Sequence, residues 1–441
     1  MSVENRIINL GRASKSLSIS FVSQITTSAV SFIVVPLLIQ YLSREKYGLW
    51  VTLVSLVSWI LMSDFGIGYG FRNKVTEYLA DKDLVKLNRH FKNTFQYYLI
   101  ITFLVTLFFL YVLANNPILS KHKSLSLIIY LPYIIYFPFS ISNQILQGLR
   151  LVHYTALIGL LRALLWFCFI AIIIHFEGSS NLINIAIGYS LINSIVNGIA
   201  VYLAITKSDI TVPNFKSLFT PPVIDKTLVT GIKFFVLQIS SLLMFSMGNY
   251  YVYSNLTPSD TAYYDTINKV YTLYMTFFNM IISVFWSEIV FQKTSGDFAK
   301  LRTTYKRLLA ISLIVSLGSF AIMFIAPFFI SFWTNNKILI NKKDCLPFSF
   351  LVSVQSLAYS GAVFLNAFEK VMPQVILAIV SIILIYPLIQ LGFKHNTGIG
   401  TVPLVSGILA LPALIICHVF ALRLIRYNAQ YDIHSEFSSG G

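Results

Sequence analysis

The sequence predicts an all-α integral membrane protein with about twelve membrane-spanning helices in two lobes of six. The first observation is composition: of 441 residues, 56% are hydrophobic and 11% are charged, whereas soluble domains carry about 25% charged residues. Such a chain has too little polar surface to cover a water-soluble globule. The second observation is a series of long apolar runs, and the third is the placement of the basic residues between those runs.

The apolar runs are long enough to cross a bilayer, because about 20 helical residues span its ~30 Å hydrocarbon core. The first run is longer than the apolar part of a signal peptide and lacks an A-x-A-like cleavage site, so we expect it to remain as a span. The expected spans are residues 17–41, 47–71, 95–114, 125–148, 152–176, 182–206, 229–254, 261–290, 308–333, 345–368, 372–393 and 398–422.

Loop charge predicts the orientation. The net charge is +15, and 21 of the 32 Lys and Arg residues lie on the N-terminal side of the membrane in this arrangement, against eight on the other side. Loops rich in Lys and Arg stay in the cytoplasm, so we expect both termini there. The same bias explains the basic composition without a nucleic-acid partner.

The longest connection between the middle spans, residues 207–228, predicts a cytoplasmic linker between lobes 1–206 and 229–441. The lobes show signs of a repeat: the sequence FVSQI at residues 21–25 matches FVLQI at 235–239, a displacement of 214 residues. Six spans per lobe would relate the lobes by a pseudo-two-fold axis along the membrane normal.

Charged residues inside the spans are candidate functional residues, because a charge in hydrocarbon costs about 2.5–3.5 kcal/mol on insertion scales. Arg162 lies ten residues into its span, roughly 15 Å deep at 1.5 Å per residue. It could face a cavity, or it could pair with an acid such as Asp64. Lys233 lies near the cytoplasmic end of its span, so its ammonium could also reach the interface.

Lys269 lies deep in the eighth span, one helical turn after Asp265, so these two residues could form an internal ion pair. Tyr271 and Tyr274 lie too deep for an interfacial aromatic belt and could line a path for sugars.

Asp64 precedes the glycines at 66, 68 and 70, where the helix could unwind. Its carboxylate could carry a proton or brace that break, and Asp265 is a second candidate for ion coupling.

No catalytic signature is present in the sequence. It contains neither a P-loop motif nor H-E-x-x-H, and the three cysteines, Cys168, Cys345 and Cys417, have no metal or disulfide spacing. We therefore expect a transporter, with no catalytic residues, no metal site and no cofactor. Three buried cations favour an anionic substrate group such as a diphosphate.

Two stretches carry a family resemblance that extends over the whole chain: VPLLIQYLSREKYGLW at residues 35–50 and DFGIG at residues 64–68. With the length and the two sets of six spans, they resemble the Wzx-type O-antigen flippases. These form the polysaccharide-export branch of the MATE-like (multidrug/oligosaccharidyl-lipid/polysaccharide) transporter superfamily.

The resemblance implies a MATE-like fold, alternating access and a place in the bacterial inner membrane. It implies that an undecaprenyl-diphosphate-linked oligosaccharide moves from the cytoplasmic to the periplasmic leaflet, driven by an ion gradient. O-antigen, capsule and teichoic-type cargoes all fit these residues. Implied partners are membrane lipids, an O-antigen polymerase and a chain-length regulator. The resemblance implies that Arg162, Lys233 and Lys269 line a cationic cavity, with Asp64 as one ion carrier.

Two rival functions remain open. A multidrug or metabolite antiporter of the same fold would need buried acids for cationic drugs, whereas the excess of buried charge here is basic. A membrane glycan polymerase or transferase would need a large periplasmic loop or acidic loop clusters. The outer connections here are short, at about ten residues, and the loops are basic.

Overall fold

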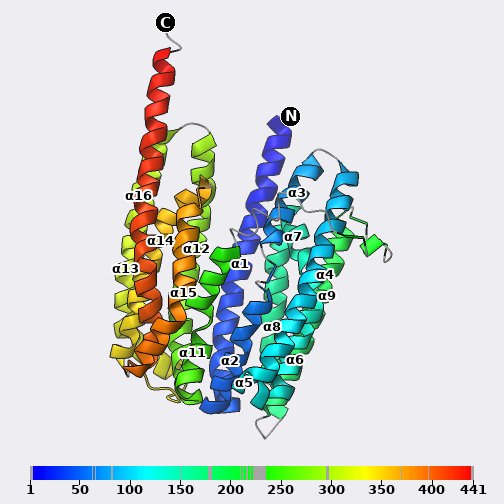
Figure 1. Ribbon diagram of the computed structural model, residues 1–441, viewed down its shortest axis with the longest axis vertical. Coiled ribbons are helices and arrows are strands. Elements are labelled where there is room, and N and C mark those ends of the chain that lie inside the picture. The colour runs from blue at the N-terminus through cyan, green and yellow to red at the C-terminus, as the bar shows by residue number, and fades with distance from the viewer. Residues whose placement is uncertain are drawn as a thin grey trace. The chain divides into compact units, whose positions relative to one another are not determined.

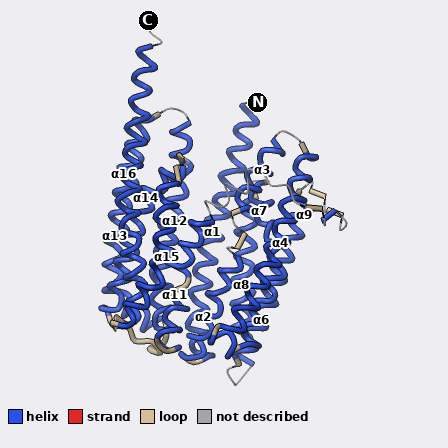
Figure 2. Tube along the Cα trace, viewed as in Figure 1, coloured by secondary structure: helices blue, strands red, loops and turns tan. Residues whose placement is uncertain are grey.

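The computed structural model describes residues 3–61, 63–64, 66–80, 83–149, 151–176, 181–208, 210–211, 213–214, 217–218, 220–221, 235–294, 297–368, 370–395 and 397–438. Within these ranges the regular structure is helical throughout (Figure 2). The chain divides into two compact units, residues 1–235 and 236–441. Most of the expected linker, 207–228, lies outside the described residues, so the boundaries expected for it and for the lobes stay predictions.

In the first unit the long helices run side by side (Figure 1). Helix α1 packs on α8, and α9 packs on both α6 and α8. The elements are α1 (Val3–Leu42), α2 (Arg44–Leu61), α3 (Ile67–Ala80), α4 (Leu84–Asn115), α5 (Pro117–Lys121), α6 (Lys123–Tyr136), the 3₁₀ helix η1 (Phe137–Ser140), α7 (Ile141–Gly148), α8 (Val152–Phe176) and α9 (Leu182–Lys207).

The second unit is also a bundle, in which α14 contacts α12, α13 and α16. Close approach of α14 and α16 depends on Gly361, where a Cβ would stand 2.9 Å from the backbone of Cys417. The elements are the π-helical turn η3 (Leu242–Ser246), α11 (Gly248–Asn255), α12 (Pro258–Thr294), α13 (Phe298–Trp333), α14 (Lys342–Ala367), α15 (Met372–Lys394), the 3₁₀ helix η4 (Gly398–Gly400) and α16 (Thr401–Ser438).

Ten of the expected spans correspond to continuous helical stretches in the described residues that are long and apolar enough to cross a membrane. The other two are interrupted. The expected span 47–71 is divided between α2 and α3, because Gly66 adopts a positive φ of 69°, a conformation that costs glycine little. The described part of 229–254 comprises an apolar helix, Phe235–Ser246, that ends in a π turn, followed by α11.

Helices α4 and α13, one in each unit, begin with the same kind of N-cap. Asp83 caps α4 by accepting from the Lys86 N–H at 2.9 Å, and its carboxylate pairs with the Lys86 ammonium at 2.8 Å. Asp297, which is 214 residues later, caps α13 in the same way, with 3.1 Å to the Lys300 N–H and 2.5 Å to its ammonium. Both are side-chain N-caps that satisfy otherwise unpaired helix donors.

Candidate functional site

Arg162 lies on α8, and its guanidinium is only partly satisfied. Nη2 donates to Asn197 Oδ1 on α9 at 2.8 Å. Nε is buried and has no hydrogen-bond partner in the described part of the chain. A buried donor left unpaired costs about 1–3 kcal/mol, so folded proteins rarely keep one without a use for it. The unpaired Nε makes Arg162 the strongest candidate for contact with a ligand.

Three tyrosines on α6 and α9 lie within electrostatic range of this guanidinium. The charge of Arg162 acts on the hydroxyls of Tyr133, Tyr136 and Tyr189, and the Tyr133 hydroxyl donates to that of Tyr189 at 3.0 Å. We call Arg162, Asn197 and these three tyrosines the Arg162 cluster. It combines a cation with hydroxyls and aromatic faces, the groups that an anionic, sugar-bearing ligand needs.

Tryptophans fix the ring of Tyr189 within this cluster. Trp50 meets it edge-on at 5.2 Å between ring centroids and Trp166 at 5.4 Å, while the two tryptophans stack at 6.0 Å. Sequence reasoning missed these aromatic and amide partners. A usable signal was the pair Asn193 and Asn197, which are four residues apart in an apolar span and so share one helix face.

Asp64 lies in the break between α2 and α3, and its side chain is 7% exposed. One carboxylate oxygen accepts from the Gly66 N–H at 3.1 Å, and the other accepts from the Tyr98 hydroxyl at 3.2 Å. The structure does not pair Asp64 with Arg162, one alternative that the sequence had left open. Asp64 braces the helix break through Gly66 and contacts α4 through Tyr98.

A further acceptor lies close to Asp64. A Cβ on Gly68 would stand 2.7 Å from Asp64 Oδ2, 2.7 Å from the Tyr98 hydroxyl and 3.1 Å from Gln144 Cγ. These three side chains therefore converge on one point. Gln144 Oε1 is buried and accepts no hydrogen bond from any residue that the structure describes. An amide oxygen without a donor favours protonation of a neighbouring carboxylate, because the protonated carboxyl group could donate a hydrogen bond to it.

Lys269 and Asp265 lie on α12 and form an ion pair. Asp265 is 4% exposed and also accepts from the Asn249 amide on α11 at 2.9 Å. Of the two alternatives for Lys269, the structure thus shows the internal pair. Because one charge offsets the other, the pair reduces the cost of placing either in the membrane.

The two deep tyrosines of α12 pack within the second unit. Tyr271 is buried, shares a hydrogen bond with Ser349 Oγ at 2.7 Å, and stacks on Phe348. Tyr274 donates to the Val315 carbonyl oxygen on α13 at 2.9 Å. Both hydroxyls are therefore used in helix–helix packing.

The remaining candidate, Lys233, lies outside the described residues. Arg162 and Asp64 belong to the first unit, and Asp265, Lys269, Tyr271 and Tyr274 to the second. Where the chain is described, no three His, Cys, Asp or Glu side chains group in a way that could hold a metal ion.

A sequence model of the family described as polysaccharide biosynthesis protein matches residues 13–286. The chain belongs to this family. The match covers the first unit from residue 13 onward, including Asp64 and Arg162, and continues through most of α12. No curated protein matches the chain at a significant level.

Several solved structures with similar folds are transporters. An inward-facing multidrug resistance MATE-family transporter of the MOP superfamily aligns with a TM-score of 0.72 and 14% identity, over 93% of this chain and 99% of that chain. An outward-facing one gives a TM-score of 0.64 and 15% identity, over 95% and 97%. A MOP superfamily transporter from Pyrococcus furiosus, described as having a binding pocket of reverse polarity, gives 0.65 and 14%, over 95% of each chain.

Family and fold together confirm the expected class, a multi-pass, MATE-like membrane protein of the polysaccharide-export branch. The fold is that of the MATE transporters, which have about twelve helices. The two interrupted helices therefore count among the spans.

Proposed function

We propose that this protein is a flippase that moves an undecaprenyl-diphosphate-linked oligosaccharide, such as an O-antigen repeat unit, across a bacterial inner membrane from the cytoplasmic to the periplasmic leaflet. One observation carries the proposal: within a membrane span, Arg162 keeps a buried, unpaired Nε, and its charge acts on three tyrosine hydroxyls. Membership of the polysaccharide biosynthesis family supports a sugar-bearing cargo.

Arg162 is the proposed ligand of the diphosphate. Its planar fork matches phosphate oxygens, and it stays charged when desolvated. The tyrosines of the Arg162 cluster would contact the first sugar through their hydroxyls and ring faces. Lys269 is less suited to this role because it pairs with Asp265, and Tyr271 and Tyr274 have their hydroxyls engaged in packing.

Coupling to a proton gradient is proposed at Asp64. Its carboxylate, the Tyr98 hydroxyl and the Gln144 side chain converge beside Gly68. Protonated Asp64 would have an O–H to donate, and the Gln144 side chain that converges with it carries a buried oxygen with no donor among the described residues. Because Asp64 also braces the break between α2 and α3, its charge state would act on the geometry of that break. Asp265, tied to Lys269, is the secondary candidate.

The test is transport in proteoliposomes that contain a lipid-diphosphate-linked oligosaccharide. The readout is the rate at which the sugar becomes accessible to an external enzyme, with and without a proton gradient. Wild type should flip the lipid. Arg162→Ala should slow flipping at least about tenfold, the factor that loss of ~1.4 kcal/mol of binding would give. Arg162→Lys should retain part of the rate, because it keeps the charge and loses the fork.

The matched control is Lys123→Ala, which removes one cation at the exposed start of α6. It should flip at the wild-type rate, with equal insertion of all four proteins verified in the vesicles. Equal rates for Arg162→Ala and Lys123→Ala would remove Arg162 from the mechanism. No flipping by folded wild-type protein would move the assignment to an antiporter of the same fold.

A further inference from the structure

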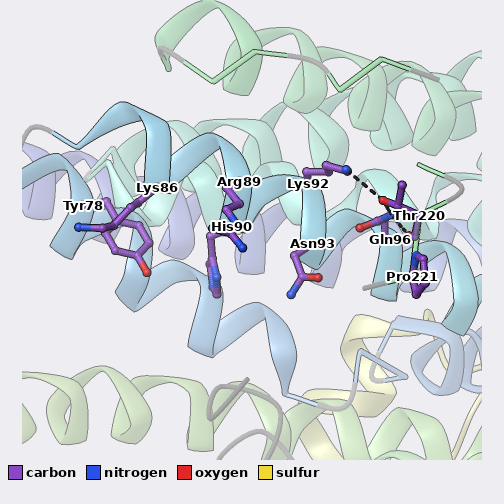
Figure 3. A pocket seen from close by; sticks show the side chains of 9 residues that line it. All are labelled: Tyr78, Lys86, Arg89, His90, Lys92, Asn93, Gln96, Thr220 and Pro221. Carbon is purple, nitrogen blue, oxygen red and sulfur yellow. Dashed lines mark hydrogen bonds between the residues drawn. The ribbon is translucent and has the colours of Figure 1, made fainter. Parts of the chain in front are cut away.

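A pocket of about 470 Å³ opens at the start of α4 in the first unit (Figure 3). Its volume falls within the range of small-molecule sites. The nine residues that line it include three cations and no carboxylate. They are Tyr78, Lys86, Arg89, His90, Lys92, Asn93, Gln96, Thr220 and Pro221.

Helical spacing places four of these side chains on one face of α4. Lys86, Arg89, Asn93 and Gln96 follow one another at intervals of three or four residues along α4. The 220–221 segment forms another wall, because Lys92 Nζ donates to Thr220 Oγ1 at 3.1 Å and the buried Gln96 amide donates to the Thr220 carbonyl oxygen at 2.5 Å. Figure 3 shows Lys92 and Gln96 directed toward Thr220, with Arg89 and His90 farther along the helix.

The basic residues of the pocket differ in whether they already have an ion-pair or hydrogen-bond partner. Lys86 is paired with Asp83, and its hydrogen bond holds the pKa of that carboxyl below its ordinary value. Arg89 is exposed and makes no hydrogen bond or ion pair with any described residue. Its guanidinium is therefore the group most ready to receive an anion, and Lys92 lies one turn later.

Position along α4 places the pocket at the membrane surface. From Asn93 to Asn115 the helix carries no charged residue, a stretch of spanning length. Arg89 precedes Asn93 by four residues, roughly 6 Å along the axis. The headgroup layer extends about 5–8 Å beyond the hydrocarbon on each side. The pocket thus lies at headgroup level on the side of the membrane that the loop charges predict to be cytoplasmic.

We propose that this pocket binds a phosphate-bearing anion at the membrane surface, with Arg89 and Lys92 holding the phosphate oxygens. The site is separate from the Arg162 cluster and does not depend on the cargo proposed above. Its ligand chemistry is a phosphate group with one or more negative charges, carried by an acidic phospholipid headgroup or by a soluble phosphate compound. The Asn93 amide lines the same pocket and is a further group that can donate to a phosphate oxygen.

The internal repeat supplies a matched control site. Helix α13 starts with the same Asp-x-x-Lys cap, but Thr303 and Thr304 stand where α4 has Arg89 and His90. Arg302, early in α13, is exposed and, like Arg89, makes no hydrogen bond or ion pair within the described ranges. Arg302→Gln and Arg89→Gln therefore remove the same charge from comparable positions, at exposed sites where folding should be unaffected.

The experiment measures binding to the purified full chain in detergent, by native mass spectrometry and by the shift of the thermal unfolding midpoint. The probes are phosphatidylglycerol, phosphatidylcholine and inorganic phosphate, the last against chloride of equal ionic strength. Wild type and Arg302→Gln should bind phosphatidylglycerol or inorganic phosphate saturably. Arg89→Gln should bind at least tenfold more weakly, and Arg89→Gln/Lys92→Gln more weakly still.

Comparison of the lipid and inorganic-phosphate probes distinguishes the two possible sources of the phosphate group. A response to phosphatidylglycerol and not to inorganic phosphate identifies a lipid headgroup, and a response to both identifies a general phosphate site. Equal binding by Arg89→Gln and Arg302→Gln would overturn the proposal, as would wild-type protein that binds none of the probes more tightly than phosphatidylcholine. Neither outcome bears on transport of the lipid-linked sugar, which is measured separately.

Discussion

At the scale of the residue, two of the buried side-chain atoms that lack a hydrogen-bond partner are the most informative. Arg162 Nε lacks an acceptor, and Gln144 Oε1 lacks a donor, among the residues that the structure describes. The first is the atom that we propose contacts the anionic cargo, and the second belongs to the side chain that converges with Asp64, the proposed proton carrier. Each unpaired group costs stability, which is expected where a site is built for a partner that comes and goes.

Gly68 tests the Asp64 site. Alanine there would bring a Cβ to 2.7 Å from both Asp64 Oδ2 and the Tyr98 hydroxyl, so the hydrogen bond between them must shift. We expect Gly68→Ala to lower the free energy of unfolding by about 1–3 kcal/mol, as overpacking does, and to weaken gradient-dependent flipping. Thermal unfolding and the proteoliposome assay measure these effects.

Gly159 on α8 is the matched control, because a Cβ there would have no neighbour within 4 Å. Gly159→Ala should leave flipping unchanged and should stabilise the fold by up to about 1 kcal/mol, through the lower entropy of the unfolded chain. If Gly68→Ala and Gly159→Ala gave the same flipping rate and the same thermal unfolding, the tight packing around Asp64 would not contribute to function.

At the scale of the element, the two units differ where the repeat would make them alike. Helix α12 runs unbroken from Pro258 to Thr294, whereas its counterpart is divided between α2 and α3 at Asp64. Displacement by 214 residues places Phe278 of α12, a fully buried aromatic residue, at the position of Asp64. The break is therefore specific to the first unit, which also contains the Arg162 cluster.

A second feature at this scale is the set of hydrogen bonds by which Gln96 on α4 holds the segment that follows α9. Gln96 is 4% exposed, and its amide donates to the carbonyl oxygens of Leu218 and Thr220. Gln96→Leu removes these hydrogen bonds, worth about 1–3 kcal/mol together, and should open the segment more often. Limited trypsin digestion after Lys216 should then be about tenfold faster, provided that opening is fast relative to cleavage.

Gln374→Leu provides the comparison for that digestion. Its amide donates to Asn366 Oδ1 at 3.1 Å and to the Ala362 carbonyl oxygen at 3.3 Å, far along the chain from Lys216. It should leave cleavage at that lysine unchanged. Unchanged cleavage in Gln96→Leu as well would show that other contacts hold the segment.

At the scale of the whole molecule, the exposed surface matches a lipid environment. Helix α4 exposes Phe103 at 63% and Tyr111 at 66%, and α13 exposes Phe328 at 81% and Phe332 at 83%. Large apolar side chains exposed in rows would aggregate in water and are satisfied in a bilayer. The protein is accordingly a multi-pass membrane protein.

The spans could be predicted from the sequence because hydropathy acts over about 20 residues and needs no knowledge of partners. The helix break at Gly66 was foreseeable from its glycines, and the position of Arg162 inside a span followed from its depth in an apolar run. Its partners were not foreseeable, because Tyr133 and Tyr189 lie on other helices. For the same reason the sequence could not show that Tyr271 and Tyr274 direct their hydroxyls into helix packing.

The most direct test of the central claim is a comparison of two cargoes in the same wild-type proteoliposomes under a proton gradient. One is a lipid-diphosphate-linked oligosaccharide, followed by its accessibility to an external enzyme, and the other is a fluorescent cationic drug, followed by uptake. The basic Arg162 cluster predicts flipping of the oligosaccharide and no drug uptake above that of empty vesicles. Drug uptake without flipping would contradict the account and identify an antiporter.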